Sequence, residues 1–307
     1  MPSPPPKAGG VSPLHHANFP EGSMSSSDGT GVHRREEMIK ISEGLALVAG
    51  PGMEKDYPTS KIAGGLLIRK DGEDLSEEGV GFGLPVLKFG DEAAFPGRSW
   101  HNLRMEGETA VVEIGYELNL VSRLSLGDRL IDIEGLCRVK GRVDRLHRDH
   151  RSIRRAMDFG SALFRRALSV ETRLLEADPF GWARVVHTIS PGGAILVRAR
   201  CWPEAEGCTE VAIMNEQGAS GFDRYIDSEG LDLSGEEIGS WERTRADWGG
   251  FADPGRHLSF KVWRAAGAEL FYGREVKPGR LAWAGLSQVA AMPSGEIEYR
   301  IEVGGGA

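Results

Sequence analysis

The sequence lacks long apolar runs and is poor in cysteine. No stretch approaches the ~20 consecutive apolar residues that a bilayer-spanning helix needs, and the N-terminus has no apolar signal-peptide core. The three cysteines, Cys137, Cys201 and Cys208, are too few and too irregular for a disulfide framework. Cys201 and Cys208 could flank a hairpin and pair, but free thiols are the simpler expectation. We therefore expect a cytoplasmic protein that does not interact with a membrane.

The common catalytic and phosphate-binding motifs are also missing. The sequence has no His-Glu-x-x-His, Cys-x-x-Cys or Gly-x-Ser-x-Gly. Gly79, Gly81 and Gly83 resemble a phosphate loop superficially, but Leu84 and Pro85 follow where a helix should begin. We interpret these glycines as a bend that lets Phe82 or another strand approach closely.

A metal site has little support in the sequence. His147 and His150 are three residues apart and could share a metal ion, but no matching cluster of Cys or His accompanies them. A hydrogen-bonded core histidine is the simpler interpretation of His150. We therefore predict no metal and no cofactor.

Negative charge predominates overall, with one basic exception. Asp and Glu number 45 against 37 Lys and Arg, for a net charge of −8, which opposes bulk nucleic-acid binding. Seven of the arginines lie within residues 145–168, where apolar or small residues recur at spacings of four and three. This pattern predicts one long amphipathic helix over about 144–168, near mid-chain.

The rest of the chain has the pattern of β-strands. Its 42 glycines and seven tryptophans favour a turn-rich β architecture. Apolar and polar residues alternate with a period of two in several short segments, namely 112–120, 131–139, 195–201, 258–262 and 297–303. Short turns between strands favour antiparallel pairing. The predicted fold class is all-β, a large antiparallel β-sandwich of the supersandwich type with the mid-chain helix.

The first 37 residues differ in composition from the rest of the chain. Residues 1–37 are rich in Pro, Ser and Gly and have almost no apolar periodicity, which is typical of a disordered tail. We expect residues 38–307 to form a single β-sandwich domain.

Two polar segments are candidates for a binding site. Residues 215–230 follow a predicted strand at 211–214 and contain Glu216, Asp223 and Asp227 among amides and aromatics. Such a mixture can hydrogen-bond a polyhydroxylated ligand and stack on its apolar face, although an ordinary solvated loop fits the pattern equally well. The second segment, 95–101, brings Arg98 and His101 together with a tryptophan.

The order of certain polar residues resembles that of galactose-mutarotase-like proteins, which bind sugars on a β-supersandwich. The residues in question are Arg98, His101, His187, Asp227 and Glu275. The resemblance implies that His187 is the general acid and Glu275 the general base on a sugar.

These observations predict a carbohydrate-binding or carbohydrate-active protein, with an activity of the sugar epimerase or mutarotase type and a small-molecule sugar as ligand. Catalysis would involve His187 and Glu275, and binding would involve Arg98, His101, Glu216, Asp223 and Asp227. The alternative is a non-enzymatic interaction protein whose arginine-rich helix docks on an acidic partner. Nucleic-acid or anionic-ligand binding through that helix is opposed by the net charge.

Overall fold

The computed structural model describes residues 36–50, 54–57, 60–90, 92–126, 129–130, 170–276, 282–292 and 295–305. These residues form antiparallel strands joined by turns, with one short 3-10 helix, η2 (Gly235–Glu237). The strands are β1 (Glu37–Ser42), β2 (Leu45–Ala49), β3 (Glu54–Tyr57), β4 (Ser60–Ala63), β5 (Leu67–Lys70), β6 (Glu73–Asp74), β7 (Gly81–Phe89), β8 (Glu92–Glu106), β9 (Thr109–Leu126), β10 (Arg129–Leu130), β11 (Val170–Ile189), β12 (Ala194–Pro203), β13 (Glu210–Gly218), β14 (Arg224–Asp227), β15 (Asp232–Ser234), β16 (Glu242–Thr244), β17 (Trp248–Asp253), β18 (Leu258–Trp263), β19 (Glu269–Val276), β20 (Ala282–Ala291) and β21 (Glu296–Gly305).

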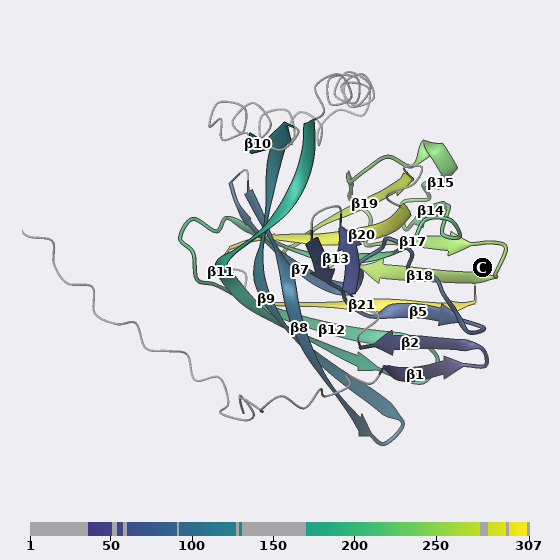
Figure 1. Cartoon of the computed structure of the whole chain (residues 1–307). Coiled ribbons are helices and arrows are strands. Elements are labelled where there is room, and N and C mark those ends of the chain that lie inside the picture. Colours follow the sequence, from purple (N-terminus) through teal and green to yellow (C-terminus); the bar gives the residue numbers. More distant parts are fainter. Residues whose placement is uncertain are drawn as a thin grey trace, which may run out of the picture. The chain divides into compact units, whose positions relative to one another are not determined.

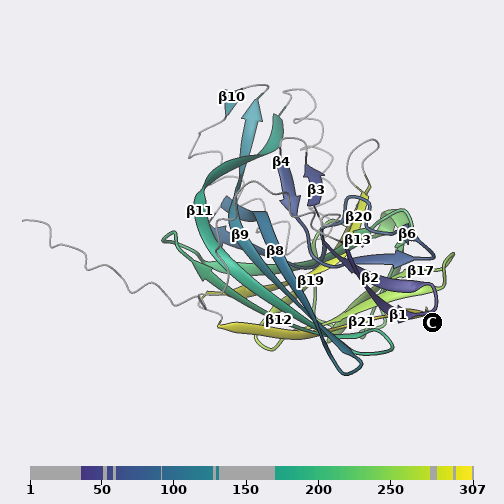
Figure 2. The same ribbon diagram turned by 60° about the horizontal axis from the view of Figure 1, so that its bottom comes forward.

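One 15-stranded antiparallel sheet dominates the fold. Its strand order is β15-β14-β17-β18-β21-β12-β11-β9-β8-β7-β13-β20-β19-β16, with β10 paired to β9. Figures 1 and 2 show β8, β9 and β11 as its longest, curved strands, and Figure 1 shows β21 between β12 and β18.

The sheet folds back on itself, so that its two ends pack face to face. Phe82 of β7 contacts Phe260 of β18 edge-on, with ring centroids 5.3 Å apart. Tyr272 of β19 stacks on Tyr225 of β14 at 3.9 Å. The core between these layers is buried and mainly apolar. Sheet-on-sheet packing of this kind is a β-sandwich, as the sequence pattern predicts.

A smaller sheet, ordered β1-β2-β5-β6, and the hairpin β3-β4 complete the described residues. The smaller sheet meets β7 through an isolated bridge between Leu66 and Phe82. Gly81 and Gly83 both have positive φ, and a Cβ atom on Gly81 would lie 2.7 Å from the backbone of Gly65. The interpretation of this glycine run as a bend for close strand approach is therefore confirmed.

The period-two pattern predicts the described strands well. Segments 112–120, 195–201, 258–262 and 297–303 lie within β9, β12, β18 and β21. Along β21 the side chains alternate between exposed and buried, starting with exposed Glu296 and buried Ile297. The predicted strand at 131–139 lies outside the described residues.

The predicted fold class is wrong in its helix. No residue that the structure describes is α-helical, and the segment of about 144–168 lies outside the described residues. The buried faces of the described strands cover one another, so this core needs no helix to close it. The alternative functions that rely on the helix therefore have no basis in the described residues. Within the same residues, no helix is long and apolar enough to cross a membrane.

The described residues test only part of the expectations about the N-terminal tail, the domain boundary and the cysteines. Residues 1–35 of the predicted tail lie outside the described residues, whereas Glu37 begins strand β1. The extent of the domain from residue 38 stays a prediction. Cys201 and Cys208 are free thiols, and Cys137 lies outside the described residues.

Candidate functional site

Strand β13 carries three consecutive polar residues, Asn215, Glu216 and Gln217, all of them buried. The sequence predicts a strand that ends at Met214 and a polar loop after it, but the strand continues to Gly218. Its pairing with β7 shifts by one residue between Met214 and Asn215, whereas its pairing with β20 is regular. Buried polar groups need hydrogen-bond partners, so the partners reveal what each residue does.

Asn215 links its own strand, β13, to three other strands. Its Oδ1 accepts hydrogen bonds from the backbone N–H of Gly83 at 3.1 Å and from the hydroxyl of Tyr299 at 2.9 Å. Its amide nitrogen donates to the carbonyls of Ile213 and Leu286. These contacts satisfy the side chain within the fold, so its role is structural.

Gln217 has a similar role toward the smaller sheet. Its Oε1 accepts from the backbone N–H of Ile68 at 3.2 Å, and its Nε2 donates to the carbonyl of Leu66 at 3.3 Å. The side chain therefore acts as an extra strand partner for the backbone at the start of β5.

Glu216 differs from its two neighbours because it is ionisable. Only 3% of the residue is exposed, and one carboxyl oxygen accepts a hydrogen bond from the backbone N–H of Val80 at 3.3 Å. Burial raises the pKa of Glu216 to about 8, and the negative charge of Glu275 contributes in the same direction. Glu216 is therefore mainly protonated at neutral pH.

Glu275 shares a sheet face with Glu216. In the regular pairings, Glu216 lies opposite Gly285 of β20, and Gly285 lies opposite Gly273 of β19. Two residues further along each strand, Gly218, Trp283 and Glu275 form a second row across the same three strands. Paired residues and residues two apart point to the same side of a sheet, so the two carboxyl groups are on one face.

Two glycines make room on this face. A Cβ atom on Gly285 would lie 2.7 Å from Cγ of Glu216, so the glutamate side chain occupies the space above Gly285. A Cβ atom on Gly273 would lie 2.4 Å from the backbone nitrogen of Trp241 and 3.1 Å from the ring of Trp283. Side chains at either position would displace the groups that gather there.

An aromatic pair completes the arrangement. Trp241 and Trp283 stack with ring centroids 4.7 Å apart and an angle of 18° between their planes. Trp241 has a positive φ of 56°, which is unfavourable for a residue with a bulky side chain. We call the group formed by Glu216, Glu275, Trp241 and Trp283 the carboxylate–tryptophan cluster.

The carboxylate–tryptophan cluster has the components of an acid–base site for a sugar. Two carboxyl groups in different environments, one buried and protonated and the other partly exposed, can divide the roles of proton donor and acceptor. Indole rings offer flat apolar surfaces for the C–H faces of a sugar ring.

His187, the predicted general acid, lies apart from this cluster on β11. The residue is 0% exposed, and its two ring nitrogens have no hydrogen-bond partner among the described residues. Burial lowers the pKa of His187 to about 4, and the nearby backbones of Phe82 and Val112 offset only part of this shift. The imidazole is therefore neutral at physiological pH, and it is enclosed in the core against Gly83 of β7.

Asp227 is fully engaged in holding its own loop. One carboxylate oxygen accepts the backbone N–H groups of Glu229 and Leu231, at 3.0 and 3.1 Å. The other accepts the hydroxyls of Tyr225 and Thr244, at 3.2 and 3.1 Å. This pattern stabilises the turn after β14 and leaves little capacity for a ligand.

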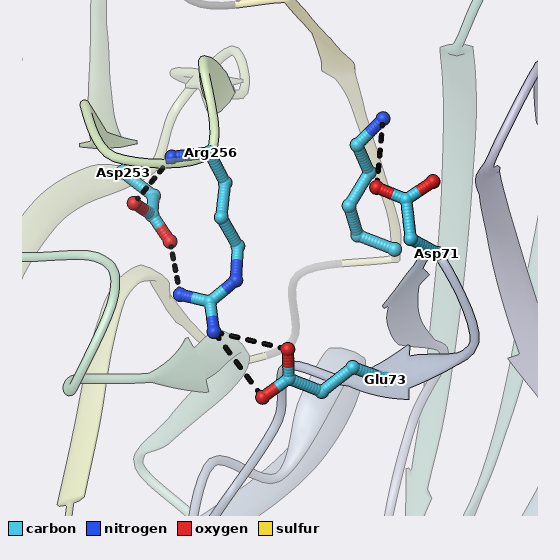
Figure 3. Close-up of polar contacts among 5 residues, drawn as sticks. Asp71, Glu73, Asp253 and Arg256 are labelled. Carbon is cyan, nitrogen blue, oxygen red and sulfur yellow. Dashed lines mark hydrogen bonds and ion pairs between the residues drawn. The ribbon is translucent and has the colours of Figure 1, made fainter.

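The loop that carries Asp223 is supported from behind by an ion-pair group. A Cβ atom on Gly221 would lie 2.3 Å from the carboxylate of Asp253. Figure 3 shows Arg256 between Asp253 and Glu73, with contacts of 2.9 Å and 3.0 Å. Asp223 itself is partly exposed, and its carbonyl accepts the N–H of Gly235 at 2.8 Å.

Arg98 and His101 lie on β8, in a different part of the sheet. Strand β8 pairs with β7 only as far as Ala94, and beyond that point it follows β9. A guanidinium nitrogen of Arg98 lies 3.6 Å from a carboxylate oxygen of Glu117. Nε2 of His101 lies 3.6 Å from a carboxylate oxygen of Glu37. Of the seven predicted site residues, the structure thus brings together Glu216 and Glu275.

Sequence reasoning missed the aromatic half of the cluster. Trp241 and Trp283 are 42 positions apart by residue number, and each taken alone is typical of a core residue. The available signal was the pair of glycines, Gly273 and Gly285, in the interiors of β19 and β20. Glycine inside a strand indicates a close approach by another group.

No group of three or more His, Cys, Asp or Glu side chains is placed to hold a metal ion in the part of the chain that the structure describes. No family model matches the sequence, and no curated protein matches it.

Solved structures that align with this chain include sugar-related proteins. An α-N-acetylgalactosaminidase from Bifidobacterium bifidum, solved with GalNAc, aligns over 88% of this chain and 36% of its own, at 10% identity and a TM-score of 0.46. A proposed aldose 1-epimerase from Escherichia coli K12 aligns over 88% and 100%, at 8% identity and a TM-score of 0.38. A proposed mutarotase from Salmonella typhimurium aligns over 86% and 92%, at 10% identity and a TM-score of 0.33.

Two of these structures are named as an aldose 1-epimerase and a mutarotase, the class of protein that the residue order of this sequence resembles. Their identities are low and their TM-scores are all below 0.5, so they assign no activity to this chain.

Proposed function

We propose that the chain binds a small sugar at the carboxylate–tryptophan cluster and interconverts its anomers. The observation that carries the proposal is the shared sheet face of Glu216 and Glu275, with the pKa of Glu216 raised to about 8. Two carboxyl groups on one face, one buried and the other partly exposed, can supply the proton donor and the proton acceptor that ring opening of an aldose requires.

In the proposed reaction, Glu275 accepts the proton of the anomeric hydroxyl while Glu216 donates a proton to the ring oxygen. The bond between the anomeric carbon and the ring oxygen breaks, and the open-chain aldehyde forms. After rotation about the adjacent carbon–carbon bond, the same two groups act in reverse and the ring closes as the other anomer. Atoms and protons balance, and no cofactor takes part.

The aromatic pair supports the choice of a sugar as ligand. A sugar ring combines hydroxyl groups, which the carboxyl groups can bind, with an apolar C–H face, which an indole ring can cover. His187 has no part in this scheme because its ring is enclosed in the core.

Polarimetry or one-dimensional NMR tests the proposal by following freshly dissolved α-glucose, α-galactose and other aldoses. The wild-type chain should accelerate equilibration of at least one of them. Glu216→Gln and Glu275→Gln should each lower the rate by about 10²-fold or more, as expected for loss of one acid–base group. Glu296→Gln, on the exposed side of β21, is the matched control and should keep the wild-type rate. Wild-type rates in both cluster variants would refute the proposal.

A further inference from the structure

A second aromatic surface lies on the opposite arm of the large sheet, across β8, β9, β11 and β12. In the strand register, Trp182 of β11 lies opposite Trp202 of β12, and Trp100 of β8 lies opposite Gly115 of β9. Trp182 and Trp100 are neighbours on this face, with ring centroids 6.1 Å apart. We call this surface, defined by Trp100, Trp182 and Trp202, the tryptophan face.

The tryptophan face points away from the core. Along β11 the alternating residues Ala183, Val185 and His187 are buried, whereas Trp182 and Arg184 lie on the other side and are at least partly exposed. Trp100 is 48% exposed, which is unusual for the largest apolar side chain. Three tryptophans on one solvent-accessible face are more than packing requires.

Gly115 shapes this face. A Cβ atom on Gly115 would lie 2.1 Å from two carbon atoms of the Trp100 indole ring. The ring therefore lies against the backbone of β9 instead of standing away from the sheet. Glycine in the interior of a strand weakens the strand, so its presence here serves the position of the ring.

The charged side chains of the face are paired with one another. Arg98 contacts Glu117 at 3.6 Å and Arg184 contacts Glu113 at 2.7 Å. Arg198 contacts Glu298 at 2.6 Å.

Arg200 lies over the ring of Trp202, 5.2 Å from its centroid. Glu204 accepts a hydrogen bond from the indole N–H of Trp182 at 2.9 Å, so a further carboxylate at this face offsets the charge of Arg200. The face is therefore close to neutral, and it complements a ligand that is uncharged and offers both hydroxyl groups and flat apolar patches. A polyanion would need an excess of guanidinium groups, and an apolar protein helix would leave the paired charges desolvated.

From this geometry we propose that the tryptophan face binds an uncharged oligosaccharide, with successive sugar rings over Trp100, Trp182 and Trp202. Three strand spacings of ~4.8 Å separate β8 from β12, so the face extends ~14 Å, long enough for several sugar rings. The site is separate from the carboxylate–tryptophan cluster and does not depend on it for its chemistry. It would hold a glycan chain on the protein without acting on it.

Isothermal titration of the full chain tests the proposal with four neutral hexasaccharides, namely cellohexaose, xylohexaose, maltohexaose and mannohexaose, and with hexagalacturonate as the charged comparison. At least one neutral hexasaccharide should bind, with a change in tryptophan fluorescence, and hexagalacturonate should not. Trp100→Ala should weaken binding by about tenfold or more, because tryptophan contacts carry a large share of the energy of such an interface. Met105→Ala removes another exposed apolar side chain from the same strand and should bind as the wild type does.

Glu216→Gln distinguishes this proposal from the proposed interconversion of sugar anomers at the carboxylate–tryptophan cluster. That variant should lose turnover and keep hexasaccharide binding, so either proposal can fail alone. The oligosaccharide proposal is overturned if no neutral hexasaccharide binds, if hexagalacturonate alone binds, or if Trp100→Ala binds as tightly as the wild type. It is also overturned if sedimentation shows a dimer that Trp100→Ala abolishes, since a second copy of the chain would then cover the face.

Discussion

The ring of His187 occupies the space in which a side chain on Gly83 would lie. A Cβ atom built on Gly83 would be 2.4 Å from Nε2 of His187, and the φ of Gly83 is +85°. Position 83 therefore excludes other residues for two independent reasons, a left-handed backbone and an occupied volume. The two residues belong to β7 and β11, so their contact joins the two layers of the sandwich.

Gly83→Ala should destabilise the protein severely. Backbone strain of ~1–3 kcal/mol adds to an overpacking cost of ~1–3 kcal/mol. Gly90→Ala is the matched control because Gly90 also has a positive φ but has no atom within 4 Å of the added Cβ. Urea unfolding should show a clearly larger loss for Gly83→Ala, and the double variant with His187→Ala should recover part of it. Equal losses at positions 83 and 90 would mean that the His187 ring imposes no constraint.

Glu216 should make the protein less stable as the pH rises. Its pKa is about 8 in the folded chain against an ordinary value of 4.5, so the folded state binds more protons between these values. The free energy of unfolding therefore falls as pH increases from 4.5 to 8, by at most ~1.4 kcal/mol per pH unit. Urea unfolding over this range should show that Glu216→Gln removes the decline, whereas Glu296→Gln retains it. A decline that persists unchanged in Glu216→Gln would contradict the assignment.

His187 should have the opposite effect at acid pH. Its pKa is lowered from 6.5 to about 4 in the folded chain, so the unfolded state binds more protons between these values. The free energy of unfolding therefore falls as the pH decreases from 6.5 to 4. Because Glu216 acts in the opposite sense over part of this window, the measurement belongs in the Glu216→Gln background. In that background, His187→Leu should reduce the decrease in the free energy of unfolding between pH 6.5 and 4. An unchanged decrease would contradict a neutral buried imidazole.

Arg256 should contribute to stability more than an exposed arginine does. It pairs with Asp253, whose carboxylate is almost completely buried, and with Glu73 of β6 (Figure 3). Arg256→Ala leaves that carboxylate without its guanidinium partner and should cost ~1–3 kcal/mol, reduced by the partial exposure of the arginine itself. Arg224→Ala breaks an exposed pair with Asp232 and should cost clearly less, because water screens that pair. Thermal unfolding of the two variants gives the comparison, and equal shifts in Tm would contradict it.

The strands are predictable from the sequence because each has one buried and one exposed face. Ile297, Tyr299 and Ile301 alternate with charged residues along β21, and the burial follows that alternation. β13 breaks the rule at Asn215 to Gln217, where polar side chains replace backbone partners of neighbouring segments. No periodicity encodes such a role, so the sequence pattern ends this strand too early.

The candidate site was predictable only in part. Glu216 and Glu275 each belong to a plausible set of polar residues, but their shared face depends on the register of three strands, β13, β20 and β19. Register is determined by packing across the whole sheet and not by the local sequence. His187 shows how a predicted site residue can prove to be a core residue. A histidine in an alternating strand can point to either face of the sheet, and this one points into the core.

The position of β21 affects the order in which the chain can fold. β21 is the last described strand in sequence, and it lies between β12 and β18, which precede it by about 90 and 30 residues. During synthesis, the segments on its two sides remain unjoined until residues 296–305 have left the ribosome. Their facing strand edges stay open for that period and can pair with other chains. Until β21 is made, these two edges are therefore places at which the nascent chain can pair wrongly.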